Sequence, residues 1–147
     1  MKRPFTKKEK SYMNIDDVKE WIKIADDDFD SARILNEAVR KHYEVICYLC
    51  AQATEKYLKG YLTYRDVIPE KTHDLPYLNS LCAEADSDFA SVKTACAFLN
   101  RFANDIRYPH KYQVSEGDVN FSIEAVEKIR NLRQISDLTH APTRSSF

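Results

Sequence analysis

The sequence has very little glycine, with 2 residues of this type among 147. Sheets built from tight hairpins usually need glycine or Asn-Gly turns at their corners. The scarcity therefore argues against a hairpin-rich β protein and favours helices joined by loops. A chain of this length is the size of one ordinary domain, and it can bury a core without disulfide or metal support.

An excess of charge of either sign is also missing, because 22 Lys and Arg residues face 23 Asp and Glu residues, for a formal net charge of −1. A protein that is drawn to nucleic acid or membranes by a global basic field carries a clear positive excess. Any nucleic-acid surface on this chain must therefore be a local patch.

Long apolar runs are absent as well. No stretch approaches the ~20 apolar residues of a membrane helix, and the basic start of the chain does not resemble a secretory signal. We therefore expect a cytoplasmic protein that makes no use of a membrane.

The four cysteines are expected to be free thiols, because a cytoplasmic chain lies in a reducing compartment. Cys47 and Cys50 form a C-x-x-C, a spacing found in zinc sites and redox motifs. No second pair of this kind follows, and a structural zinc needs four ligands. Both residues also lie within a strong helical pattern. We interpret them as core residues, and we expect no metal and no cofactor.

Apolar residues recur at helical spacing in five segments, which predict four long helices and one short helix. The first long helix is expected from an N-cap at Asn14 to about residue 39, and the second from about residue 43 to 64. Asp74 is expected to cap the short third helix. The fourth is expected from residue 87 or 88 to about 106, and the last from Ser115 or Asp118 onward.

These segments predict an all-α, antiparallel up-and-down bundle. We assign residues 1–13 to a flexible basic arm, residues 14–139 to the bundle and residues 140–147 to a disordered tail. Asp26, Asp27, Asp28 and Asp30 crowd the first helix. Because neighbours in sequence fan out around a helix, we interpret them as a solvated acidic face rather than a metal site.

The second helix has an unusually wide apolar arc, which covers more than half of its circumference. Such a helix is either central in its own bundle or buried twice, in the core and against a partner. The second alternative supports a homodimer. Its narrow polar side is expected to carry Tyr48, Gln52, Lys56, Lys59 and Thr63.

Three short motifs occur in order along the chain. They are Cys50-Ala-Gln-Ala-Thr-Glu-Lys-Tyr-Leu-Lys59 on the second helix, Thr72-His73-Asp74-Leu75 before the third, and Arg107-Tyr108-Pro109 after the fourth. Together they resemble the HEPN family (higher eukaryote and prokaryote nucleotide-binding proteins) over nearly the whole chain. The resemblance implies a homodimeric helical bundle with a cleft for nucleotides or RNA. It also implies a small nucleotidyltransferase as partner, in toxin–antitoxin-like pairs.

Some members of that family are metal-independent ribonucleases, with Arg followed after four to six residues by His near the start of the last core helix. Here His110 follows Arg107 too soon, and Tyr112 misses a related Arg-to-Tyr spacing by one residue. Arg133 and His140 have the spacing, but at the far end of the last helix. The sequence therefore predicts a binding protein rather than a nuclease.

The residues themselves suggest how a nucleotide would be held. Arginine pairs with phosphate through its planar fork, and a tyrosine ring can stack on a base. Lysines add phosphate contacts, and histidine can carry a proton. The predicted nucleotide-binding residues are Arg107, Tyr108, Arg101, Asn104, Lys56, Lys59 and His73.

Most of these residues also have a simpler structural explanation. Lys59 forms an i,i+4 pair with Glu55 that stabilises a surface helix slightly. His73 can bond a loop carbonyl, and Arg107 can pair with an aspartate of the first helix. Three functions therefore stay open: a nucleotide- or RNA-binding module that also docks a partner, an RNA endonuclease using Arg107 with His110 or His73, and a structural dimer without ligand.

Overall fold

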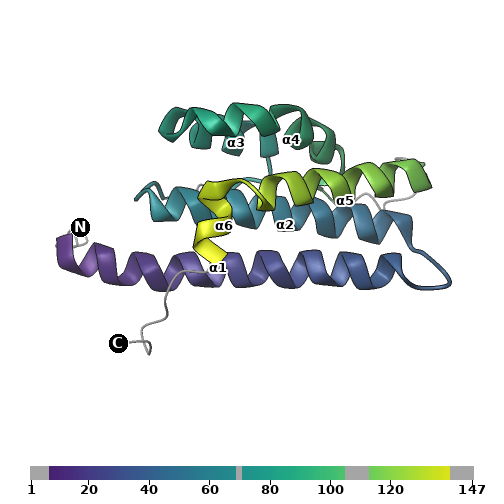
Figure 1. Ribbon diagram of the computed structural model, residues 1–147, viewed down its shortest axis with the longest axis horizontal. Coiled ribbons are helices and arrows are strands. Elements are labelled where there is room, and N and C mark those ends of the chain that lie inside the picture. Colours follow the sequence, from purple (N-terminus) through teal and green to yellow (C-terminus); the bar gives the residue numbers. More distant parts are fainter. Residues whose placement is uncertain (1–6, 69–70, 105–112, 140–147) are drawn as a thin grey trace.

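The computed structural model describes residues 7–68, 71–104 and 113–139, with side chains from residue 15 onward (Figure 1). In this part of the chain all regular structure is helical, which confirms the all-α class. No helix in these ranges is both long and apolar enough to cross a membrane. The elements are α1 Lys7–Asn36, α2 Tyr43–Tyr64, α3 Leu75–Ala85, the 3₁₀ helix η1 Ser87–Val92, α4 Lys93–Leu99, the 3₁₀ helix η2 Asn100–Phe102, α5 Glu116–Arg130 and α6 Arg133–Thr139.

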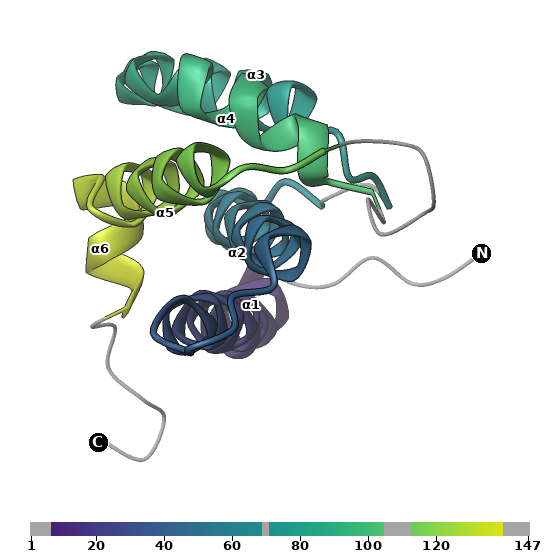
Figure 2. The ribbon, with the colours of Figure 1, turned by 90° about the vertical axis from the view of Figure 1, so that its right-hand side faces the viewer.

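Helix α2 lies in the centre of the bundle. It runs between α1 on one side and the α3–α4 pair on the other, with α5 alongside (Figures 1 and 2). Of its 22 residues, 13 are buried. Neighbours within the same chain therefore account for its wide apolar arc, which means that the arc gives no support to a dimer.

Helix bounds that depend on local signals agree with the prediction. Helix α2 has the expected limits. Asp74 caps α3 by accepting a hydrogen bond from the Tyr77 amide at 3.1 Å. The Ser115 hydroxyl accepts from the Asp118 amide at 3.1 Å, while the Asp118 carboxylate accepts from the Ser115 amide at 3.0 Å. This capping box fixes the start of α5.

The first helix was placed wrongly at both ends. Helix α1 begins at Lys7, so Asn14 lies inside it rather than at its N-cap, and it ends at Asn36 instead of near Val39. Residues 7–13 contain no glycine or proline, and most of them are good helix formers. That segment therefore contains no residue that would prevent the helix from beginning before Asn14.

The fourth and last helices are broken where the sequence predicted continuity. The fourth segment divides into η1, α4 and η2, although its apolar stripe is buried as expected. The last segment stops after Arg130 and restarts at Arg133 as α6, which turns toward α1. This turn buries Ile135 and Leu138. The gain in packing against α1 explains the break better than any local breaker residue.

Two features of the core bear on later arguments. Cys47, Cys50, Cys82 and Cys96 are all fully buried, which confirms them as core residues. Gly60 lets α1 and α2 approach closely. A Cβ there would lie 2.9 Å from Ile22 Cδ1 and 3.3 Å from Trp21 Cβ.

Candidate functional site

A buried carboxylate organises most of the polar residues on α2. Glu55 is 2% exposed. Its Oε1 atom lies 2.6 Å from His73 Nδ1, and its Oε2 atom accepts from Lys56 Nζ and Lys59 Nζ, each at 3.1 Å. Lys56 also donates to Gln52 Oε1 at 2.9 Å. We call these five residues the Glu55 cluster.

The cluster keeps Glu55 ionised. Burial alone would raise the pKa of the Glu55 carboxyl, but the hydrogen bond from His73 and the charges and hydrogen bonds of Lys56 and Lys59 outweigh it. The pKa therefore lies below its ordinary value. An ionised carboxylate that accepts three hydrogen bonds is a strong anchor for its donors.

Of the three side chains that bond Glu55, two reach solvent and one does not. Lys59 is 6% exposed and lies under the Trp21 ring, 5.7 Å from its centroid. The side chain of Lys56 is 17% exposed and that of His73 is 59% exposed. Lys59 therefore serves to hold Glu55, while Lys56 and His73 present donors to the outside.

Contact with Glu55 also sets the orientation of the His73 ring. An Nδ1 atom beside an ionised carboxylate carries a proton, and this leaves Nε2 as the outward nitrogen. That atom can accept a proton, or donate a hydrogen bond once the ring is protonated. The geometry is that of a carboxylate-oriented imidazole.

The sequence suggested that the acidic residues of α1 form one solvated face, but in the structure their surroundings differ. Asp27 and Asp30 are exposed and pair with neighbours on α1. Asp28 is half-buried, and its pKa is raised by burial, with Lys56 acting in the opposite direction and Glu55 adding to the rise. The charges of Lys56 and Glu55 thus act on the Asp28 carboxyl, which connects α1 electrostatically to the Glu55 cluster.

The same face holds the end of η2. Gln52 Nε2 donates to the carbonyl of Ala103 at 3.4 Å, and Asn100 Oδ1 accepts from the Leu75 amide at 3.1 Å. Asn104 follows directly and is exposed. Arg107, Tyr108 and His110 lie outside the described residues.

Arg101 has different neighbours from the rest of the predicted set. Its guanidinium carbon lies 5.4 Å from the Phe98 ring centroid and 5.1 Å from that of Phe102. Its Nη1 atom is 3.6 Å from Asp118 Oδ1. The structure thus brings Lys56, Lys59 and His73 together and places Arg101 on the α4–α5 side of η2.

The simpler explanations for Glu55 and His73 were wrong in their details. The Glu55–Lys59 pair is buried rather than exposed on a surface helix. His73 bonds the Glu55 carboxylate instead of a loop carbonyl. The two differences come from different neighbours: Trp21 of α1 lies over Lys59, and His73, just before α3, contacts Glu55.

A second polar network was missed. Tyr57 is fully buried, and its hydroxyl donates to Asp26 on α1 and accepts from Arg130 Nε on α5 at 3.1 Å. Arg130 Nε also lies 3.1 Å from Asp26 Oδ1. A buried tyrosine hydroxyl needs a partner, so the sequence indicated that one existed but not which. This network ties three helices together.

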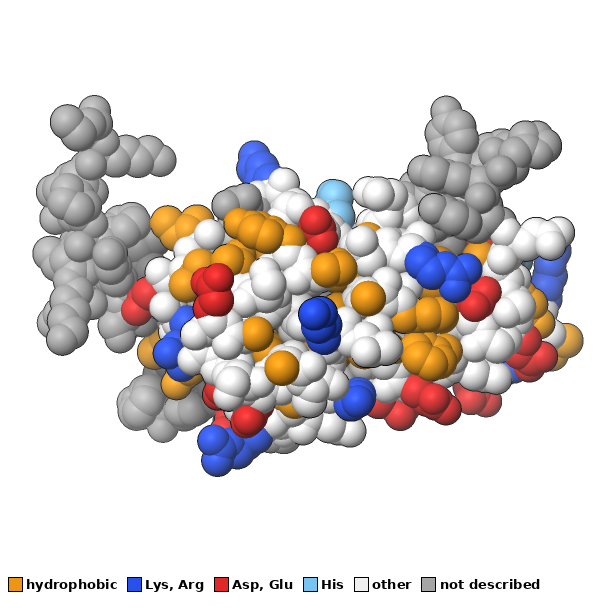
Figure 3. Space-filling view, turned by 90° about the horizontal axis from the view of Figure 1, so that it is seen from above, with side chains coloured by type: hydrophobic (Ala, Val, Ile, Leu, Met, Phe, Trp, Pro, Cys, Tyr) orange, Lys and Arg blue, Asp and Glu red, His pale blue; other side chains and the backbone are white. Residues whose placement is uncertain are grey.

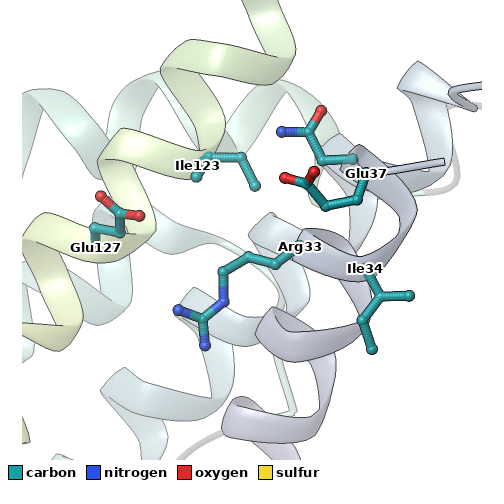
Figure 4. Close-up of a pocket in the computed structure, with 6 residues that line it drawn as sticks. Arg33, Ile34, Glu37, Ile123 and Glu127 are labelled. Atoms are coloured by element: carbon teal, nitrogen blue, oxygen red, sulfur yellow. The ribbon is translucent and has the colours of Figure 1, made fainter. Parts of the chain in front are cut away.

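A separate shallow hollow of about 350 Å³ lies between α1 and α5 (Figure 4). It is lined by Arg33, Ile34, Asn36, Glu37, Ile123 and Glu127. Arg33 is paired with Asp30. Across the described residues, no three His, Cys, Asp or Glu side chains are grouped so that they could hold a metal ion.

The surface carries no continuous field of one charge on the face shown in Figure 3. Hydrophobic side chains gather there in small patches between scattered basic and acidic ones. This agrees with the balanced net charge of −1. On this face, basic groups are therefore available singly rather than as a broad basic surface.

Comparison with known proteins gives a consistent result. The family model of the HEPN domain matches residues 18–136. The crystal structure of ST0689, described as an archaeal HEPN homologue, is similar with a TM-score of 0.64 and 26% sequence identity. The match covers 82% of this chain and 97% of that one. No curated protein matches the sequence closely enough to count as a relative.

Proposed function

The chain belongs to the HEPN domain family, and from this premise we propose that it binds a nucleotide or RNA at the face formed by the Glu55 cluster. One observation carries the proposal. Glu55 holds His73 through one oxygen and Lys56 through the other, so two donors are fixed beside each other at the surface. A pre-positioned pair of this kind suits a phosphate group.

The remaining predicted residues have distinct parts in this proposal. Asn104 lies next to Ala103, which Gln52 ties to the cluster. Arg107 and Tyr108 follow a few residues later and would add a phosphate fork and a stacking ring. Lys59 supports the site by holding Glu55. Binding should be weak, because a net charge of −1 gives no long-range attraction for phosphate.

The proposal includes assembly. We expect a homodimer that docks a small nucleotidyltransferase, as the two halves of a toxin–antitoxin-like pair. Family membership supports both partners. Light scattering at tens of micromolar, above typical dimer dissociation constants, should give the mass of a dimer, and a clean monomer would contradict this part.

A second function, metal-independent RNA cleavage, is favoured by one observation. His73 is oriented by an ionised carboxylate, which is how many general acid–base histidines are held. We rank it second because the Arg-to-His spacing of the nuclease branch is missing. Incubating labelled RNA with the protein in a chelator decides between them. Robust cleavage that His73→Ala or His110→Ala abolishes would establish the enzyme.

The binding proposal is tested by titrating labelled short RNA and a nucleotide with wild type and single variants. Lys56→Gln, His73→Gln and Arg107→Ala should each weaken binding by about tenfold or more, since a charged hydrogen bond contributes roughly 1.5–3 kcal/mol. Lys128, which is exposed on α5, provides the matched control. The Lys128→Gln variant should bind like wild type. Absence of binding by wild type at millimolar ligand would refute the proposal.

A further inference from the structure

Three phenylalanine rings contact one another in a row that runs from the core to the surface, edge-on or tilted rather than stacked. Phe102 is fully buried. Phe98, half-buried, lies 5.6 Å from it between ring centroids, and Phe121 lies 4.3 Å from Phe98. Phe121 is 45% exposed. The outermost ring therefore has an open surface, and the two inner rings hold it in place.

Arg101 lies over the two inner rings of this row. Its guanidinium carbon lies within 5.4 Å of two ring centroids, and its side chain is 44% exposed. The separation of 3.6 Å from Asp118 is longer than a hydrogen bond. Since a guanidinium group has five N–H donors, most of them are available to an anion, although Asp118 competes for it. We call Phe98, Arg101, Phe102 and Phe121 the aromatic platform.

The platform is too small for a protein partner by itself. Only three of its side chains reach solvent, whereas a stable protein interface uses about 20–30 residues and buries about 800 Å² on each side. One or two nucleobases match this size. An aromatic ring stacks on any base. An adjacent arginine can then pair with the phosphate that joins the stacked nucleotide to the next nucleotide.

The position of the platform connects it to the proposed binding face. Arg101 lies within η2, and Ala103, two residues later, accepts the hydrogen bond from Gln52 of the Glu55 cluster. The cluster and the platform are therefore held by the same short turn. A single-stranded ligand that occupied one of them would have the other within a few nucleotides.

We propose that the aromatic platform is a second subsite, at which Phe121 stacks on a base of single-stranded RNA and Arg101 binds the neighbouring phosphate. The proposal rests on the proposed function, because it assumes that the Glu55 cluster binds a phosphate of the same strand. It predicts that a short oligonucleotide binds more tightly than a mononucleotide, since only the longer ligand occupies both subsites.

The test measures the affinity of a fluorescently labelled RNA hexamer and of a labelled mononucleotide. Phe121→Leu keeps the apolar bulk but removes the ring, and it should weaken hexamer binding at least fivefold while leaving mononucleotide binding unchanged. Phe121→Tyr keeps the ring and should stay within about twofold of wild type. Tyr64→Leu, an exposed aromatic on α2, should have no effect.

Arg101→Gln should weaken hexamer binding and reduce the slope of log affinity against log salt by about one phosphate contact. If wild type binds the hexamer and Phe121→Leu binds it equally well, this inference is wrong and the proposed function stands. If wild type binds neither ligand, the proposed function fails as well. A shift of the Phe121→Leu variant from dimer to monomer in light scattering, with RNA affinity unchanged, would instead assign the platform to contact between two copies.

Discussion

Replacing Glu55 with alanine should destabilise the fold by about 3–5 kcal/mol, because it leaves the buried Lys59 ammonium without its carboxylate. Lys59 is 6% exposed and cannot easily recover its hydration. The change is a large part of the roughly 5–15 kcal/mol that stabilises a typical domain. For a chain of this size it corresponds to a fall in melting temperature of about 6–20 °C.

The order of effects in a small set of variants tests the reasoning more sharply than one value. Lys59→Met should cost less than Glu55→Ala, since Glu55 keeps Lys56 and His73 as partners. The double variant Glu55→Gln, Lys59→Met should recover much of the loss, because it removes both buried charges together. Urea unfolding followed by far-UV circular dichroism gives the free energies.

An exposed carboxylate provides the control. Glu124→Ala on α5 should change stability by no more than about 0.5 kcal/mol. If Glu55→Ala melts at the same temperature as this control, Lys59 does not depend on Glu55 and the account of the cluster is wrong.

The pH dependence of the same variants follows from the lowered pKa of Glu55. A carboxyl whose pKa is lowered by folding stabilises the protein at pH values above its unfolded pKa of 4.5. This stabilisation is lost as the pH falls below that value. The difference in unfolding free energy between wild type and Glu55→Gln should therefore shrink as the pH falls from about 7 to about 3. A constant difference would contradict the assignment of the charge to Glu55.

Three further outcomes are expected. Burial raises the pKa of the Cys47 thiol to about 11, so the native protein should react slowly with a thiol reagent near pH 8 and expose four thiols in urea. Gly60→Leu should cost more than about 2 kcal/mol in urea unfolding, since a Cβ there already lies 2.9 Å from a side-chain carbon of α1, whereas Gly117→Ala should be tolerated. Arg130→Met should cost roughly 1–3 kcal/mol with an unchanged m-value, because Asp26 loses its cation.

Local signals made much of the fold predictable. The limits of α2, the Asp74 cap and the Ser115–Asp118 capping box are each set by residues within a few positions of one another. The breaks in the fourth and last helices were not predictable in this way. They depend on how distant helices pack, and no glycine or proline marks the turn after Arg130.

Some members of the Glu55 cluster were predictable from the sequence, but the way the cluster is built was not. Lys56, Lys59 and His73 were all named from the sequence, yet the residue that joins them, Glu55, was interpreted as part of a surface pair. Glu55 and His73 are 18 residues apart in the sequence, and they belong to α2 and to the segment just before α3. Helical periodicity contains no information about where such a segment returns.

The Asp26–Tyr57–Arg130 network has a consequence for the order of folding. Helices α1 and α2 are consecutive and pack more extensively than any other pair, so contacts close in sequence can form this hairpin early. The bond between Asp26 and Arg130 spans 104 residues and must wait until α5 docks. Interactions absent from the transition state set the unfolding rate and leave the refolding rate nearly unchanged. We therefore expect this network to slow unfolding more than it speeds folding.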